Sequence, residues 1–190
     1  MWYLSLLMRA LQDVLADKTR KRVSEGELYA SYDNLARIIR QNFVPNLVVA
    51  IDTGGSIPGE MIAQRLKIPI VHITVRRSIK ITRRYGNDPV LLRWVMSVYH
   101  HYLFRLTKPV ISVDINTDIS GKNILVVDDS IHTGATIDVV TDHLRRAGAH
   151  RIVTASLTYV SENKPDYSVI APGNYSFPWS KDYNNIKPSS

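Results

Sequence analysis

Two adjacent carboxylates and a run of small hydroxyl residues form the segment of this chain best suited to chemistry. The segment reads VVDDSIHTGAT over residues 126–136. Its hydroxyl side chains are Ser130, Thr133 and Thr136. A helix that begins after such a turn presents free N–H groups, so the segment predicts a nest for a phosphate dianion. Asp128 and Asp129 would repel a phosphate alone, but they suit a ligand that also offers hydroxyl donors, as a ribose does.

Other phosphate-binding motifs are excluded. A P-loop ends in Gly-Lys-Ser/Thr and a dinucleotide fingerprint reads G-x-G-x-x-G, and neither pattern occurs here. Gly134 would let the backbone approach a phosphate without a Cβ in the way. The alternative interpretation is that this segment binds no ligand and is only an acidic turn ahead of a capped helix. Such turns are common, but the whole string behind a valine-rich strand is not.

Alternating helices and strands are predicted to position this segment. Helices are expected over residues 32–43, 60–66, 91–106 and 137–147, and strands over residues 47–51, 68–75, 110–113, 123–127 and 151–158. This alternation predicts right-handed crossovers and a parallel sheet with helices on both faces. Ligands of such sheets bind at the carboxyl ends of the strands, where the acidic segment lies.

One domain is expected over residues 1–190. Its core would cover about residues 24–160, followed by an irregular C-terminal hood at about 161–190, and an amphipathic helix at 2–17 would precede it. The stretch 2–16 lacks the basic start of a signal peptide, and residues 91–107 are too short and too charged to span a bilayer. No membrane segment is therefore expected.

Composition narrows the classes of function. The chain has no cysteine, which excludes disulfides, thiolate metal sites, iron–sulfur clusters and cysteine nucleophiles, and makes the cytoplasm the expected location. The formal net charge of +7 indicates an anionic partner. Charge alone leaves nucleic acid, a membrane surface and phosphorylated small molecules open.

The acidic segment closely resembles the phosphoribosyl-pyrophosphate (PRPP) signature of the type I phosphoribosyltransferases. Residues 32–70 resemble the helix–strand–loop–helix that precedes the signature in that family. The motifs KPDY at 164–167 and FPW at 177–179 are similar to the base-binding region of purine members, particularly those of xanthine–guanine type. The resemblance spans about residues 24–180. It implies a Rossmann-like parallel sheet flanked by helices, with a small hood.

The resemblance implies a role for each part of the site. Asp128 and Asp129 would bind the ribose hydroxyls and, with His132, form the catalytic group. The 5′-phosphate would be wrapped by Ser130, Ile131, His132, Thr133, Gly134, Ala135 and Thr136. The pyrophosphate would meet Thr53, Gly54, Gly55, Arg77 and Lys80. The implied cofactor is Mg²⁺, held mainly by PRPP oxygens with weak help from the two aspartates.

The last two of these pyrophosphate residues belong to a basic stretch at 76–84. In the family a mobile loop near this place closes over the substrate. A solvated face or a nucleic-acid contact remains the alternative for most of these cations.

Three departures from the family pattern leave the base open. Thr53 stands where many purine members carry Arg or Lys. No Lys occupies residues 159–161, where many members contact the purine oxo group, and Lys164 is either a substitute or part of the structural KPDY turn. His132 stands where purine members often place an Asp that faces the base. Its imidazole can accept a proton from a base nitrogen at neutral pH, or its backbone alone can serve the phosphate nest. The expected base-binding residues are Tyr175, Phe177 and Trp179, with Tyr175 preferred for stacking.

The expected function is transfer of the 5-phosphoribosyl group from PRPP to a purine base, with release of pyrophosphate, in nucleotide salvage. A 6-oxopurine (hypoxanthine, guanine or xanthine) is favoured. One alternative is a PRPP- or nucleotide-sensing regulator of the same fold, and another is a transferase for adenine or a pyrimidine. A homodimer or larger homo-oligomer is expected, no membrane contact is, and nucleic acid stays open as a partner that is not favoured.

Overall fold

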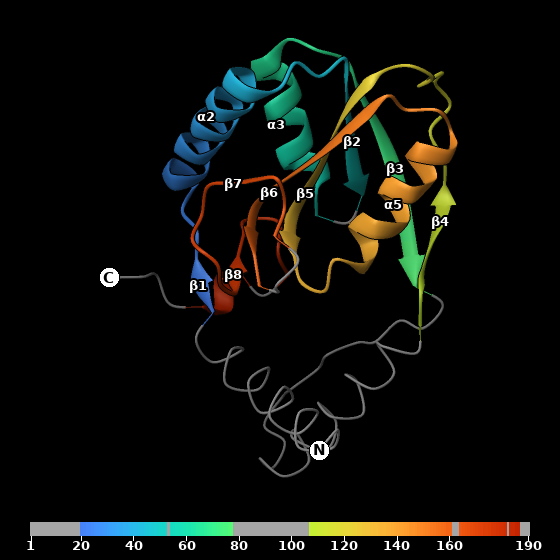
Figure 1. The fold of residues 1–190 in the computed structure, drawn as a ribbon. Helices are drawn as coiled ribbons and strands as arrows, with labels where there is room; N and C mark the ends of the chain where they lie inside the picture. Colours follow the sequence, from blue (N-terminus) through green and yellow to red (C-terminus); the bar gives the residue numbers. More distant parts are fainter. Residues whose placement is uncertain (1–19, 53, 78–106, 161–163, 182, 187–190) are drawn as a thin grey trace, which may run out of the picture.

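A six-stranded sheet in the order β4-β3-β2-β5-β6-β7 organises the chain (Figure 1). The computed structural model describes residues 20–52, 54–77, 107–160, 164–181 and 183–186. The strands are β1 (Lys21–Arg22), β2 (Leu47–Asp52), β3 (Ile70–Arg77), β4 (Pro109–Val113), β5 (Asn123–Ile131), β6 (Arg151–Tyr159), β7 (Tyr167–Ser168) and β8 (Tyr175–Ser176). Neighbouring strands are parallel except β4, which runs antiparallel to β3. Strands β1 and β8 form a separate parallel pair.

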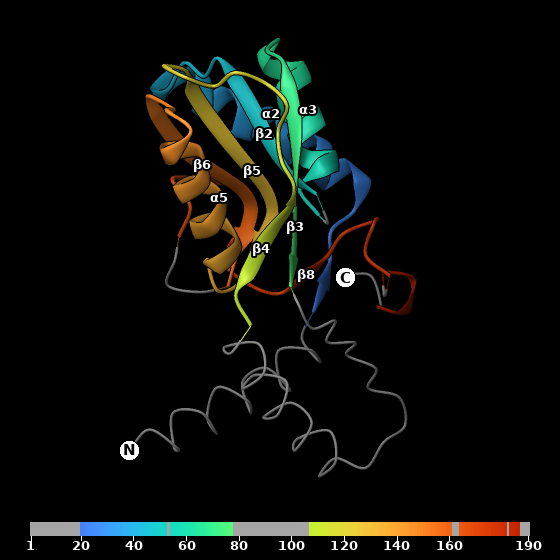
Figure 2. The same cartoon turned by 90° about the vertical axis from the view of Figure 1, so that its right-hand side faces the viewer.

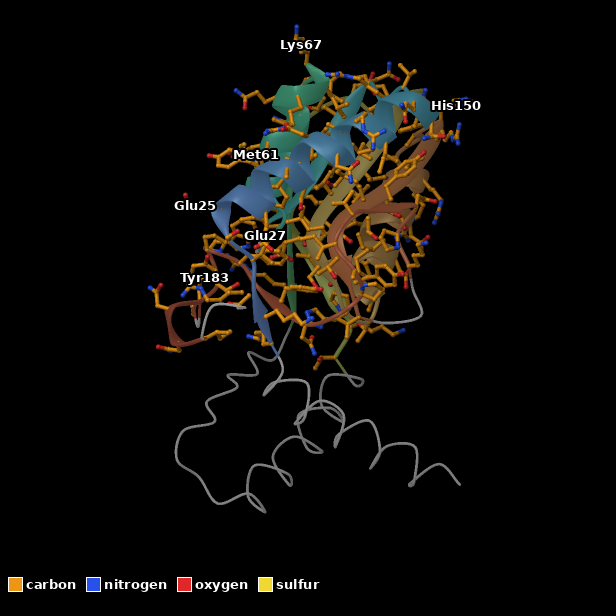
Figure 3. The ribbon with its side chains drawn as sticks, turned by 90° about the vertical axis from the view of Figure 1, so that its left-hand side faces the viewer. Glu25, Glu27, Met61, Lys67, His150 and Tyr183 are labelled. Carbon is orange, nitrogen blue, oxygen red and sulfur yellow. The ribbon has the colours of Figure 1, made fainter. Side chains whose placement is uncertain are left out.

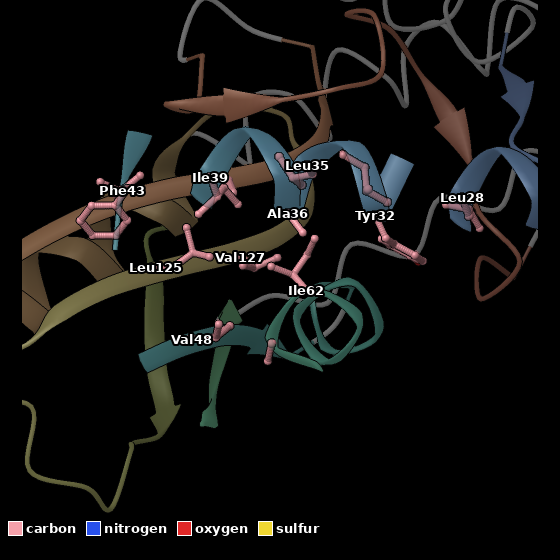
Figure 4. Packing of buried hydrophobic residues seen from close by; sticks show 14 of the residues in the cluster. Leu28, Tyr32, Leu35, Ala36, Ile39, Phe43, Val48, Ile62, Leu125 and Val127 are labelled. Atoms are coloured by element: carbon pink, nitrogen blue, oxygen red, sulfur yellow. The ribbon is translucent and has the colours of Figure 1, made fainter. Parts of the chain in front are cut away.

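Helices cover both faces of the sheet, as Figure 2 shows. They are α2 (Glu25–Asn42), α3 (Ser56–Leu66) and α5 (Ala135–Arg146), and a short 3-10 helix η1 (Tyr183–Asn185) lies near the C-terminus. Helices α2 and α3 pack on one face, where Leu125 and Val127 of β5 meet Leu35 and Ile62 (Figure 4). Helix α5 packs on the other face. The sheet is therefore buried on both sides, which explains the apolar strands.

The predicted α/β class, a parallel sheet flanked by helices, is confirmed, and among the described strands of the sheet edge strand β4 runs antiparallel. Helix α2 begins at Glu25, earlier than the apolar stripe indicated, because Ser24 and Glu27 form a capping box. The Ser24 hydroxyl accepts from the Glu27 N–H at 3.3 Å, and the Ser24 N–H donates to Glu27 Oε2 at 2.7 Å. The expected helices at 2–17 and 91–106 lie outside the described residues.

The helices begin and end at opposite edges of the sheet. Figure 3 shows Glu25 and Glu27, at the start of α2, far from Lys67, at the end of α3. Helices α3 and α5 follow strands β2 and β5 directly, so they begin at the carboxyl edge of the sheet. In the described ranges, no helix is long and apolar enough to cross a membrane.

Candidate functional site

Strands β2 and β5 are neighbours at the centre of the sheet, and the connections after them diverge. The chain passes from β2 to β3 on one side, and from β5 to β6 on the other. In open α/β sheets such a switch point creates a crevice at the carboxyl ends of the strands, where ligands bind. The loop before α3 and the loop before α5 both begin at this edge of the sheet.

The loop before α3 lies in close contact with the end of β5. A Cβ added to Gly54 would lie 2.3 Å from Asp129 Oδ2 and 2.6 Å from Oδ1. A Cβ on Gly55 would lie 2.6 Å from the carbonyl oxygen of Val127. Both distances are far below van der Waals contact, so the two glycines let the β2 loop lie directly on the end of β5.

The acidic pair lies within β5 rather than in the loop that the sequence predicted. Asp129 lies on the side of the sheet under α2 and α3, because it contacts Trp179 and the Gly54 loop there, and Asp128, the preceding residue of the strand, points to the opposite side. The Asp129 N–H donates to Asp128 Oδ1 at 2.9 Å. The pair therefore spreads its carboxylates around the strand end instead of presenting them side by side.

Burial raises the pKa of both aspartates. For Asp128 the negative charge of Asp129 raises the pKa further, well above its ordinary value. For Asp129 the effect of burial is opposed by a hydrogen bond from Trp179 and by the charge of His132. A ligand that donates hydrogen bonds or brings a cation would stabilise the ionised form of these two partly buried carboxylates, which repel each other.

Helix α5 begins at this edge with donors free for an anion. Its N-cap is Gly134, whose φ of 76° lies in the left-handed region that favours glycine, and no side chain caps the helix. The first N–H groups of a helix have no intrahelical acceptor and carry the positive end of its dipole. The turn thus has the features of a phosphate site.

The remaining residues predicted for that nest differ in exposure. His132 and Thr133 are exposed, and Ser130, Ala135 and Thr136 are partly buried. The Ile131 side chain is 3% exposed and packs in the core under α5, so only its backbone is left for a ligand.

Asp52 is a site residue that the sequence analysis missed. It ends β2, and its carboxylate accepts from Ser56 Oγ at 2.7 Å and from Thr74 Oγ1 at 2.9 Å, with His72 Nδ1 at 2.9 Å. Burial alone would raise the pKa of Asp52, but these hydrogen bonds lower the pKa below its usual value. An ionised Asp52 therefore ties the start of α3 to β3 beneath the Gly54 loop. Its position directly after the LVVAI run was the available signal.

Asp52→Asn is expected to lower the free energy of unfolding at pH 7, because a neutral amide accepts hydrogen bonds more weakly than a carboxylate. The lowered pKa in the folded state fixes the sign. The contribution of Asp52 is complete above the unfolded pKa of about 3.9 and disappears as the pH falls through the folded value. Urea unfolding at pH 7 and at about pH 3 measures the difference.

Asp142→Asn is the matched control, because Asp142 is an exposed residue of α5 that pairs with Arg145 at 2.7 Å. Exposed pairs of this kind contribute about 0–1 kcal/mol. A loss for Asp52→Asn that is equal at both pH values would contradict the assignment.

The C-terminal hood reaches the acidic pair through Trp179. Its indole Nε1 donates to Asp129 Oδ2 at 3.0 Å. Its ring stacks on Phe177, with centroids 5.0 Å apart and planes 10° from parallel. Phe177 is 2% exposed and belongs to the core, so it supports Trp179 rather than lining an open pocket. Tyr175 is partly buried in β8, opposite Lys21 of β1.

Tyr32 brings a buried phenol from α2 toward the same carboxylate. It is 2% exposed, and its hydroxyl has no hydrogen-bond partner among the described atoms. Burial raises the pKa of Tyr32 to about 12, with the Arg65 guanidinium opposing and the charge of Asp129 adding to the rise. The hydroxyl therefore stays protonated across the physiological range. Nothing in the spacing of the sequence pointed to this residue.

Some predicted pyrophosphate contacts fall outside the described residues. These are Thr53, Lys80 and most of the basic stretch, and the side chain of Arg77 at the end of β3. Gly54 and Gly55 are the predicted pyrophosphate residues that the structure places at the switch point.

The side chains at this site could supply only a minor part of the ligands of the implied magnesium ion. The described parts of the chain contain no group of three or more His, Asp or Glu side chains that could hold a metal. Mg²⁺ in proteins is commonly bound by one or two carboxylates together with substrate phosphates and water. Asp128 and Asp129 match that pattern.

Comparisons with known proteins agree with this geometry. A family profile described as "Phosphoribosyl transferase domain" matches residues 24–179. The fold is similar to a purine phosphoribosyltransferase from Pyrococcus horikoshii OT3, with a TM-score of 0.66 and 25% identity, covering 85% of this chain and 95% of that one.

Two further solved structures share the fold at lower identity. A xanthine-guanine-hypoxanthine phosphoribosyltransferase from Helicobacter pylori has a TM-score of 0.60 and 17% identity, covering 87% of this chain and 97% of that one. A hypothetical protein from Neisseria gonorrhoeae with bound ppGpp has a TM-score of 0.63 and 18% identity, covering 87% and 93%.

A curated relative matches over a shorter stretch. Over 60 residues the chain is 38% identical to a ribose-phosphate pyrophosphokinase from Pyrococcus furiosus, which is 30% of this chain and 22% of that protein. The chain thus spans about a fifth of that relative's length. The family profile, in contrast, covers most of the chain and includes both loops of the switch point. The chain belongs to the phosphoribosyltransferase family.

Proposed function

We propose that this phosphoribosyltransferase-family chain transfers the 5-phosphoribosyl group of PRPP to a purine base and releases pyrophosphate. The observation that carries the proposal is the contact of Asp129 with Gly54 beside the uncapped start of α5. That contact brings together a carboxylate for ribose hydroxyls, a close-approach loop for pyrophosphate and a helix N-terminus for the 5′-phosphate. PRPP is a ligand with these three parts.

The proposed reaction exchanges one bond at C1′ for another. The bond from C1′ to the pyrophosphate oxygen breaks, and a bond to a base nitrogen forms through an oxocarbenium-like transition state. Asp128 and Asp129 would fix the ribose through its 2′- and 3′-hydroxyls, so that C1′ faces the base. Asp128 and Asp129 would help to hold a magnesium ion bound to PRPP, which would neutralise charge on the pyrophosphate.

His132 is the proposed acceptor for the proton that leaves the base nitrogen. It is exposed in the turn between β5 and α5, and its charge acts on Asp129. A neutral imidazole has the basicity for this step near neutral pH. The 5′-phosphate would lie against the same turn, from Ser130 to Thr136, and the pyrophosphate against the Gly54 loop.

A 6-oxopurine is the proposed acceptor. A planar base would stack on the aromatic hood, with Tyr175 as the proposed stacking residue. The similar structures from P. horikoshii and H. pylori are described as purine enzymes. Hypoxanthine, guanine and xanthine are the candidates.

A panel of bases tests the proposal. The protein is mixed with magnesium, PRPP and one base at a time, and nucleotide and pyrophosphate are quantified. Product is expected with at least one of hypoxanthine, guanine and xanthine. Product with adenine or a pyrimidine alone would reassign the substrate from a 6-oxopurine to that base. No product with any base would overturn the proposed transferase activity. Asp129→Asn serves as the inactive control.

A nucleotide-binding regulator is the second candidate. The similar N. gonorrhoeae protein holds ppGpp, and the +7 charge of this chain suits a polyanionic ligand. Calorimetry with PRPP, a purine nucleotide and ppGpp distinguishes the two candidates. Tight binding without turnover in the base panel would favour regulation, and RNA binding that falls steeply with salt would add a nucleic-acid partner.

A further inference from the structure

The hood and the acidic pair are joined by one direct side-chain hydrogen bond among the contacts described. Trp179 Nε1 donates to Asp129 Oδ2 at 3.0 Å, across 50 residues of sequence. A hydrogen bond to a carboxylate fixes the oxygen that accepts it, because charge-assisted bonds are shorter and stronger than neutral ones. The position of Asp129 thus depends on a residue that belongs to another part of the fold.

The core fixes the orientation of Trp179. Its ring lies 5.0 Å from the ring of Phe177 at an interplanar angle of 10°. Phe177 is 2% exposed and packs among the buried residues under α2 and α3. The face of the indole that meets Phe177 is therefore covered, and the N–H edge is directed at Asp129.

The loop before α3 confines the same carboxylate from another direction. A Cβ on Gly54 would come within 2.3 to 2.6 Å of the Asp129 carboxylate carbon and oxygens. Asp129 is consequently enclosed between the Gly54 backbone and the Trp179 indole. If Trp179 withdrew, the carboxylate would lose a donor and gain room to rotate.

We infer that Trp179 is a positioning residue that holds the Asp129 carboxylate against Gly54 in the orientation that the ribose hydroxyls need. The inference rests on the proposed function, since it concerns the carboxylate of Asp129, which would bind the ribose hydroxyls. It also separates Trp179 from Tyr175 within the hood: Trp179 serves the sugar and Tyr175 the base. Ribose binding and hood docking are then linked, and each favours the other.

The Trp179→Phe variant tests the inference, because it keeps an aromatic ring beside Phe177 and removes the N–H donor. The dissociation constant of PRPP, measured by calorimetry without any base, is expected to rise about ten-fold, as for loss of one charged hydrogen bond. The KM for the base is expected to change much less. A residue that stacked on the base would give the reverse pattern, and that result would overturn the inference.

Tyr183→Phe is the matched control. The Tyr183 hydroxyl donates to the carbonyl oxygen of Val23 at 3.0 Å, so the variant also removes one aromatic donor near the end of the chain, away from Asp129. Its PRPP affinity is expected to stay near that of the wild type. Equal losses in both variants would mean that Trp179 acts only through general stability, and the inference would fail.

A spectroscopic readout keeps the inference testable if Trp179→Phe does not fold or if no base is used. The chain has three tryptophans, so ¹⁵N-labelled indole gives three N–H resonances. Asp129→Asn is expected to move the Trp179 indole resonance, and an unmoved resonance would overturn the inference. If the wild type binds no PRPP while that resonance moves, the proposed function fails and the Trp179–Asp129 contact stands.

Discussion

Asp128→Asn is expected to lower the use of PRPP sharply and at the same time to raise the thermal stability of the ligand-free protein. Burial and the neighbouring Asp129 charge raise the pKa of Asp128 well above its ordinary value, so the ionised carboxylate is unfavourable in the empty site. Asparagine removes that charge with little change in shape. Single stabilising substitutions in proteins commonly yield about 0.5–2 kcal/mol.

The sign of the pH dependence follows from the raised pKa. Below the unfolded pKa of about 3.9, Asp128 is neutral in both states and the two proteins are expected to be equally stable. Between that pH and the raised folded value, the wild type must take up a proton when it folds, and above the folded value it must bury a charge, whereas the variant does neither. The advantage of Asp128→Asn therefore appears on the neutral side and is absent in acid.

Calorimetric melting without magnesium or PRPP measures the first effect, at about 2–4 °C per kcal/mol for a chain of this size. Activity measures the second. Loss of carboxylate hydrogen bonds to a ribose hydroxyl, at about 1.5–3 kcal/mol each, predicts a fall of about 100-fold or more in kcat/KM for PRPP. Asp142→Asn, on the exposed face of α5, controls for removal of a charge as such. A variant that is less stable than the wild type at pH 7 would refute the argument.

The acidic pair could be found from the sequence, but its arrangement could not. Asp has low strand propensity, so the segment that begins at Asp128 and Asp129 reads as a loop. In the fold β5 continues to Ile131, because β6 supplies partners as far as Tyr159. Strand alternation then sends Asp128 and Asp129 to opposite faces. Pairing with a strand twenty residues later in the chain overrides local preference, and no local pattern records it.

Contacts between distant segments account for the rest of what the sequence left open. Trp179 and Asp129 are separated by 50 residues, and the FPW motif fits a base contact as well as it fits a hydrogen bond to a carboxylate. The direction of β4 is likewise absent from its short apolar run, which suits either orientation. Asp52 is different, because a carboxylate that directly follows a buried strand at the switch point could have been selected by the same argument that selected Asp128.

Gly54→Ala is expected to weaken PRPP binding about 100-fold through a single methyl group. The added Cβ would lie 2.3 Å from Asp129 Oδ2, where no atom fits, so the carboxylate must rotate away. Rotation breaks the 3.0 Å hydrogen bond from Trp179 and removes the acceptor from the ribose hydroxyls. Alanine keeps the backbone N–H that the pyrophosphate would use, so the loss reports the position of Asp129 rather than the loss of a donor.

Gly26→Ala is the matched control for this variant. Gly26 lies in the first turn of α2, and a Cβ there would meet nothing within 4 Å. The exchange is expected to leave PRPP affinity unchanged and to stabilise the helix by about 0.5–1 kcal/mol. Gly55→Ala, in contrast, is expected to destabilise the fold, since the added Cβ would clash with the backbone of β2 and β5.

A double-mutant cycle identifies the route of the effect. If Gly54→Ala acts by moving Asp129 off Trp179, adding Trp179→Phe should cost little more, because the hydrogen bond is already lost. Residues in one network typically show coupling of about 0.5–3 kcal/mol, whereas independent sites add. Calorimetry of the two single variants and the double variant with PRPP gives the coupling directly. Full additivity, or wild-type affinity in Gly54→Ala, would show that the Gly54 loop and the indole do not act on the same carboxylate.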